Sequence, residues 1–199
     1  QVIRENKLEE AQDLIAATCQ ESPDNKNLLF QIGLGCAQNN RLNDAQLIFE
    51  KLQNFNQDDH RIPFNLALIC SMQGDYFGAI EAYDLALAIK PDDADALVNK
   101  GSTFNEIKNY KAALESLNAA IRINPEIPEA WLNRGIALNH LERYQEAISS
   151  YDEAIKLNPA YFEAWSNRSI PLKNLKQYQQ ACESCDVALS YRSDYSMAW

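Results

Sequence analysis

Apolar side chains recur along this chain at intervals of three and four residues, in blocks of about thirteen residues separated by short polar stretches. Such spacing places the apolar residues of a block on one face of a helix. The clearest pair of blocks predicts helices over 129–141 and 144–157. The breaks inside such pairs, for example 142–143 and 176–177, fit only antiparallel helical hairpins. No useful length of chain alternates with a period of two, so we predict no strands.

The paired blocks repeat with a period of 34 residues, which is typical of a stacked-repeat architecture. If each unit is numbered from 1 to 34, position 20 is an alanine in every unit: Ala11, Ala45, Ala79, Ala113, Ala147 and Ala181. We therefore expect one solenoid over 1–199, with a partial repeat at 1–25 whose second helix covers 8–19. The full repeats are predicted at 26–59, 60–93, 94–127, 128–161 and 162–195, and a further repeat starts at 196–199.

Small residues recur where two helices of a repeat would approach each other closely. Position 8 carries Gly33, Ala67, Gly101, Gly135 and Ser169. Bulkier residues such as Tyr151 are expected to fill the space that these positions leave. A large side chain at Ala147 would overpack the same seam, at a cost of roughly 1–3 kcal/mol.

Proline marks the ends of the repeats and disturbs one of them. Pro91, Pro125 and Pro159 occupy position 32, where they stop one helix before the next begins. Pro63 falls in a first helical turn, where it is tolerated. Pro171 falls inside a predicted helix, removes a backbone hydrogen bond and costs about 3 kcal/mol. We therefore expect a kink or an early break at Pro171.

Composition and charge exclude several classes of partner. The formal net charge is -10, from 18 basic and 28 acidic residues, which disfavours nucleic acid and anionic membrane surfaces. No apolar run approaches the roughly 18–20 residues that span a bilayer, so membrane insertion is not expected. The five cysteines are an odd number in a large helical chain, which favours free thiols in a reducing compartment.

The ends of the chain suggest a piece of a longer protein. The first residue is not methionine, and Trp199 corresponds to the first aromatic residue of a new repeat. No secretory signal is apparent near the start. From the absence of targeting signals we expect a cytoplasmic location.

The repeat resembles the tetratricopeptide repeat (TPR), which has an aromatic residue at position 4, small residues at 8 and 20, an aromatic at 24, alanine at 27 and proline at 32. The unit at 128–161 carries this pattern as Trp131, Gly135, Ala147, Tyr151, Ala154 and Pro159. The resemblance covers essentially the entire chain and implies an all-α fold, a right-handed α-solenoid of stacked antiparallel helix pairs. It also implies a concave groove, lined by the first helix of each repeat, that takes an extended peptide or a partner helix.

Position 6 would face that groove, and it carries an amide in every full repeat: Gln31, Asn65, Asn99, Asn133 and Asn167. An asparagine amide both donates and accepts, so this amide ladder can pair with the backbone of an extended protein or peptide ligand. The alternative is that each amide only satisfies its own helix backbone.

The other expected groove residues are apolar in the early repeats and mostly polar in the later ones: Phe64, Leu68, Ser102, Asn105, Leu132, Ile136, Asn139 and His140. The apolar groove residues of the early repeats either contact the ligand or are buried against a missing neighbour or a second copy of the chain.

Several chemistries are disfavoured. A clamp for an acidic C-terminus needs basic residues beside the amides, but the groove offers only Arg61 and Lys173, and Arg134 and Arg168 at position 7 point toward packing. Neither histidine has the neighbours of a metal site or a nucleophile pair, so no cofactor is predicted. Cys182 and Cys185 have a redox-like spacing, but position 24, where Cys185 stands, is a core place.

Three hypotheses follow for function. The first is a non-enzymatic scaffold that binds an extended or helical segment of a partner protein. The second is the substrate-selecting repeat arm of a longer enzyme. The third is self-association, as a homodimer formed through exposed repeat faces.

Overall fold

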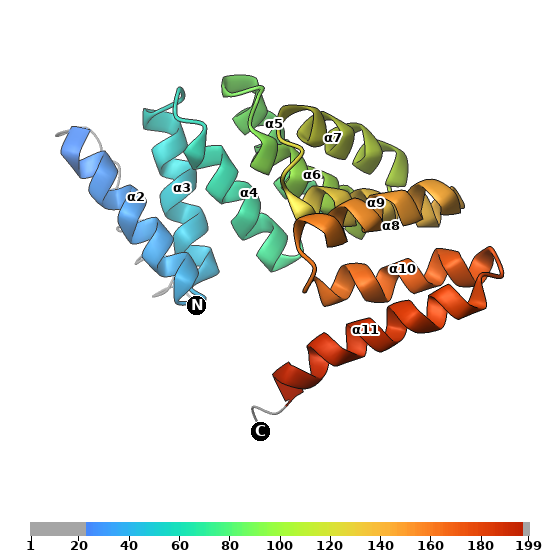
Figure 1. The fold of residues 1–199 in the computed structure, drawn as a ribbon. Helices are drawn as coiled ribbons and strands as arrows, with labels where there is room; N and C mark the ends of the chain where they lie inside the picture. Colours follow the sequence, from blue (N-terminus) through green and yellow to red (C-terminus); the bar gives the residue numbers. More distant parts are fainter. Residues whose placement is uncertain (1–22, 197–199) are drawn as a thin grey trace. The chain divides into compact units, whose positions relative to one another are not determined.

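The computed structural model describes residues 23–196, which form ten helices and no strands (Figure 1). The helix predicted over 8–19 lies outside the described residues, as do 197–199. The helices are α2 (Pro23–Gln38), α3 (Leu42–Phe55), α4 (Arg61–Gln73), α5 (Tyr76–Ile89), α6 (Ala94–Glu106), α7 (Tyr110–Ile123), α8 (Pro128–His140), α9 (Tyr144–Leu157), α10 (Phe162–Asn174) and α11 (Tyr178–Ser196). The helices predicted over 129–141 and 144–157 are thus found as α8 and α9, within one residue at each end.

The chain divides between Pro91 and Asp92 into two compact units. In the described chain, unit 1 contains α2 to α5, and unit 2 contains α6 to α11. Within each unit every helix packs on the next one in sequence, so that helix pairs stack in chain order. The predicted all-α solenoid of helix pairs is confirmed, whereas the individual repeat boundaries stay predictions.

The turn between the two helices of a repeat has the same backbone geometry each time. The residue at position 15 is in the left-handed region, with φ between 58° and 81°, at Asn40, Gly74, Lys108, Glu142 and Lys176. The next N–H then donates to the carbonyl of position 11, as from Arg143 to Leu138 at 2.9 Å. This six-to-one bond of a Schellman motif closes the first helix and fixes the short turn.

The close approach of the paired helices depends on position 8. A Cβ atom built on Gly135 would lie 2.5 Å from the Tyr151 ring, and one on Gly101 would lie 2.5 Å from Leu117 Cγ. Because both distances are below van der Waals contact, the glycines allow an approach that alanine would not. The position-20 alanines Ala45, Ala79, Ala113 and Ala147 are 0% exposed, as the packing prediction requires.

Two tryptophans close the turn between repeats in unit 2. The indole N–H of Trp131 donates to the Pro125 carbonyl at 2.8 Å, and that of Trp165 to the Pro159 carbonyl at 3.0 Å. In both cases the residue at position 4 is bonded to position 32 of the preceding repeat. The end of one repeat is thereby tied to the first helix of the next.

Arginines at position 7 tie the first helices α8 and α10 to both neighbouring second helices. Arg134 of α8 donates to Asn118 Oδ1 of α7 at 2.8 Å and to Ser150 Oγ of α9 at 2.6 Å. Arg168 of α10 makes the equivalent bonds to Asp152 Oδ1 at 2.7 Å and Ser184 Oγ at 2.8 Å. These side chains therefore point toward packing, as predicted, and they also bond the buried hydroxyls of Ser150 and Ser184.

The expected early break at Pro171 does not occur. Helix α10 continues through Pro171 to Asn174, and the Leu175 N–H then donates to the Pro171 carbonyl at 3.0 Å. Pro171 and its neighbour Leu172 are buried, and Leu172 is 0% exposed. Packing of this turn and the bonds that follow it offset the one backbone bond that proline cannot make.

Gly135→Ala is expected to lower the free energy of unfolding by about 1 kcal/mol. The new methyl group overpacks against Tyr151 at roughly 1–3 kcal/mol, which exceeds the gain of about 1 kcal/mol that alanine brings to a helix interior. Urea denaturation followed by circular dichroism measures the change. Gly35→Ala is the matched control, because a Cβ there meets nothing within 4 Å. It should raise stability, and equal effects at both sites would contradict the close-approach argument.

Arg134→Met is expected to cost about 1–2 kcal/mol, because it removes two hydrogen bonds from a charged donor. Both partners of Arg134 are neutral, so the loss should change little with salt. Arg168→Met also breaks an ion pair with Asp152, so part of its cost should be absent at high salt. Denaturation at low and high NaCl distinguishes the two variants. Arg143→Met, which breaks only an exposed pair with Glu146, should leave the midpoint nearly unchanged.

Candidate functional site

The first helices of the repeats form the inner layer of unit 2. Helix α8 contacts both α6 and α10, whereas within the described chain the second helices α7, α9 and α11 do not contact one another. Helices that approach each other more closely lie on the inside of a curved stack. We call the side of α6, α8 and α10 turned away from the second helices the inner face. The predicted site residues Asn99, Ser102, Asn105, Asn133, Ile136, Asn139, His140 and Asn167 belong to these three first helices, and the repeat register predicts that they lie on this face.

The amides at position 6 differ between the two units. The Asn65 side chain donates to the carbonyl of Arg61, four residues earlier in its own helix, at 2.7 Å. Gln31 is exposed on α2. In unit 2, Asn99, Asn133 and Asn167 are half-buried, and their side chains make no hydrogen bond within the described chain. The alternative that the amide satisfies its own helix therefore describes Asn65 and not the three asparagines of unit 2.

A second pair of amides lies deeper on the inner face. Asn105 of α6 donates through Nδ2 to the backbone carbonyl of Asn133 on α8, at 3.0 Å, and so joins the two helices. The Oδ1 atoms of Asn105 and Asn139 are both buried, and no group of the described chain donates to either. A buried acceptor without a donor costs about 1–3 kcal/mol. The inner face thus holds two oxygens in equivalent positions whose hydrogen bonds the chain itself does not supply.

The remaining predicted residues of unit 2 surround these amides. His140 is exposed and stacks on Tyr110 of α7, with ring centroids 4.4 Å apart and planes 4° from parallel. Ile136 is half-buried against the core cluster. Leu132, which we expected to line the groove, is only 8% exposed and belongs to that cluster, so it lies beneath the face.

Several groove residues of unit 1 are already in contact with other side chains of the same unit. Phe64 and Leu68 are half-buried, and the Phe64 ring meets Tyr83 edge to face at 6.0 Å. The Arg61 guanidinium lies over the Phe30 ring and makes two bonds to Asp59, at 2.8 and 2.6 Å. The pKa of Asp59 is lowered by these bonds. Arg61 is therefore already engaged, which agrees with the exclusion of a carboxylate clamp.

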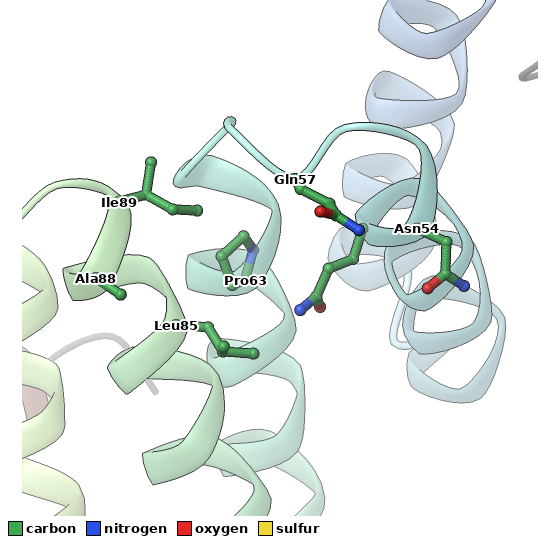
Figure 2. Close-up of a pocket in the computed structure, with 7 residues that line it drawn as sticks. Asn54, Gln57, Pro63, Leu85, Ala88 and Ile89 are labelled. Atoms are coloured by element: carbon green, nitrogen blue, oxygen red, sulfur yellow. The ribbon is translucent and has the colours of Figure 1, made fainter.

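One pocket of unit 1 was not predicted. Its volume is about 340 Å³, and it lies among the ends of α3 and α5 and the first turn of α4 (Figure 2). The residues labelled in Figure 2 are Asn54, Gln57, Pro63, Leu85, Ala88 and Ile89. The available sequence signal was the departure of Pro63 and Leu85 from the residues that other repeats carry at positions 4 and 26.

Residues 23–196 offer few candidates for other chemistry. No group of three or more His, Cys, Asp or Glu side chains is arranged to hold a metal ion. None of the described helices combines the length and the apolar character needed to cross a membrane. Cys36 and Cys70 are buried, as expected for core filling, and their thiols are free. Cys185 is exposed rather than buried, because in the described chain only α10 packs against α11.

The fold is similar to that of several solved structures. A MamA protein from Desulfovibrio magneticus RS-1 superposes with a TM-score of 0.79 at 20% identity, covering 85% of this chain and 96% of that chain. YrrB, described as a TPR protein with an unusual peptide-binding site, gives 0.74 at 18% identity, covering 92% and 95%. PilF from Pseudomonas aeruginosa gives 0.75 at 21% identity, covering 83% and 76%. At these identities the likeness concerns the fold alone.

No curated protein matches the chain in sequence. A family model described as tetratricopeptide repeat matches residues 37–94 and 99–162, which is more than half of the chain. These ranges contain the helix pairs α4–α5 and α8–α9, the glycines Gly101 and Gly135, and the amides Asn99 and Asn133. The chain belongs to the tetratricopeptide repeat family.

Proposed function

We propose that the inner face of unit 2 binds an extended segment of a partner protein. The observation that carries this proposal is the set of three unengaged amides, Asn99, Asn133 and Asn167, at the same position of three successive first helices. Each amide offers one acceptor and two donor hydrogens. A chain running across α6, α8 and α10 meets them in turn and presents the N–H and C=O groups that they need.

The surroundings of the amides define the ligand further. Ile136 is half-buried and Ile170 is 47% exposed, so the ligand presents apolar side chains at this part of the face. The stacked rings of His140 and Tyr110 add a flat surface for an aromatic or aliphatic side chain. The amides bind the backbone of the ligand, and the isoleucines contact its apolar side chains. This is the usual division of roles in the recognition of an extended peptide.

The family and one relative support the same class of function. Tetratricopeptide repeat proteins generally mediate protein–protein interactions and are typically non-enzymatic. YrrB, which shares the fold, is described as having a peptide-binding site. A non-enzymatic scaffold is therefore the role we propose for this chain.

Peptides selected on the full chain from a random phage-displayed library are expected to bind the inner face. For such a peptide, Asn99→Ala combined with Asn133→Ala should weaken binding about tenfold to thirtyfold, because each lost hydrogen bond contributes about 1 kcal/mol. Fluorescence anisotropy with a labelled peptide measures the affinity. Asn65→Ala is the matched control, since that amide is bonded to its own helix, and it should leave the affinity unchanged. Unchanged binding by the double variant, or equal weakening by the control, would remove the inner face as the site.

A second candidate function, self-association, is favoured by the exposed side of α11. Tyr178, Cys182, Cys185 and Leu189 form a stripe along this helix, and Tyr178 and Leu189 are 60% and 62% exposed. The equivalent stripe of α9 is covered by α10, where Ile148 and Tyr151 are 5% and 1% exposed. The α11 stripe thus has the composition of a repeat interface. We propose that a second copy of α11 covers it, in a two-fold dimer.

Such a dimer predicts a concentration-dependent mass in sedimentation velocity and a disulfide between Cys182 or Cys185 of the two copies under mild oxidation with diamide. A two-fold axis near the middle of the stripe brings these thiols together. Leu189→Lys should abolish both signals, because it buries a charge in the interface. Met72→Lys, which alters another exposed apolar side chain, serves as the control. A monomer at every concentration would eliminate the self-association proposal and leave the peptide-binding proposal intact.

A further inference from the structure

The pocket of unit 1 lies where a tryptophan stands in unit 2. Its floor is Pro63 at position 4, and Trp131 and Trp165 occupy position 4 of later repeats. Both indoles extend toward position 32 of the preceding repeat and bond its carbonyl. The residue at that position beside the pocket is Gln57. In unit 1 Pro63 is smaller than an indole and has no side-chain N–H to donate, and the pocket is lined by both Pro63 and Gln57.

The wall of the pocket on α5 is more apolar than the same part of α9. Leu85 and Ala88 stand at positions 26 and 29 of α5, where the repeat at 128–161 carries Glu153 and Lys156. Figure 2 shows Leu85, Ala88 and Ile89 along α5 beside Pro63. Leu85 is 47% and Ile89 37% exposed, so the wall of the pocket presents apolar surface to solvent. Exposed apolar surface of this kind marks a site that a partner covers.

The opposite rim is polar but uncharged. It is formed by Gln53 and Asn54 at the end of α3 and by Gln57 in the following loop. Their amides can pair with the backbone on either side of an inserted side chain. An apolar pocket of about 340 Å³ with a few convergent polar groups has the dimensions and character of a ligand site.

We propose that this pocket binds the indole side chain of a tryptophan in a segment of a partner protein, in the place that Trp131 and Trp165 fill from within the chain. The ring packs on Pro63, Leu85 and Ala88, and its N–H donates to the Gln57 carbonyl, as the internal indoles donate to Pro125 and Pro159. An aliphatic side chain would fill the volume but leave that carbonyl without its donor. The site is separate from the inner face of unit 2, so either proposal can fail without the other.

N-acetyl-tryptophanamide is the probe, titrated into the methyl-labelled full chain and followed by NMR. The methyl signals of Leu85 and Ile89 are expected to shift and saturate with a Kd on the order of 1 mM, as suits a ligand of this size. The 1-methylindole analogue, which has no N–H, should bind about fivefold more weakly. N-acetyl-leucinamide should bind at least about tenfold more weakly, since it lacks both the ring and the donor.

Two substitutions test the location. Ala88→Lys introduces the residue that Lys156 provides at position 29 and should weaken the probe at least about tenfold by closing the apolar wall. Pro63→Trp should abolish probe binding, because the indole of the new side chain would itself fill the pocket. Phe77→Lys is the control on the same helix, outside the pocket, and it introduces the residue found at Lys111. It should leave the titration unchanged.

Four outcomes would overturn the proposal. They are no saturable shift of the Leu85 and Ile89 methyls, equal binding of the leucine and tryptophan probes, undiminished binding by the Ala88→Lys variant, and free indole binding at least about tenfold more tightly than the peptide-like probe. The last result would point to a small molecule rather than to a protein segment.

Discussion

The contact between position 8 and position 24 governs how closely the two helices of a repeat approach. In three repeats a glycine faces a bulky side chain, as Gly135 faces Tyr151, with no room for a methyl group. Other contacts between the helices depend on this close approach. Arg134 reaches hydroxyl and amide groups on two neighbouring helices only because those helices lie close to its own. The inner layer of unit 2 exists for the same reason, since first helices that pack tightly on second helices can also contact one another.

Much of the fold could be predicted because the same sequence pattern recurs in each repeat. Helix lengths, short turns and small residues recur in register, so a departure in one unit does not obscure the pattern. The turn geometry could not be read in this way. Lys108, Glu142 and Lys176 have no preference for the left-handed conformation that they adopt. Hydrogen bonds around the turn impose it, and among these five turns Gly74 and Asn40 are the residues whose types favour this conformation. Pro171 is the converse case, in which a strong local signal is overridden by burial in the packed repeat.

The candidate sites, like the fold, could be predicted only in part from the sequence. The positions of the amides followed from the repeat register, but their bonding state did not. Asn65 and Asn99 stand at the same position, yet only Asn65 bonds its own helix, and that difference depends on side-chain conformation. The pocket in unit 1 depends on residues from three elements, so no single stretch of sequence contains it. Its signal lay in several small departures from the repeat pattern, each of which was unremarkable alone.

The placement of the tryptophans has a practical consequence for any study of unfolding. All three lie beyond residue 130, so intrinsic tryptophan emission reports on unit 2 and does not sense the loss of structure in unit 1. The two units have separate core clusters and can lose structure separately. A fluorescence transition for this chain therefore describes one half of it. An indole placed at position 63 would give the other half a reporter of its own.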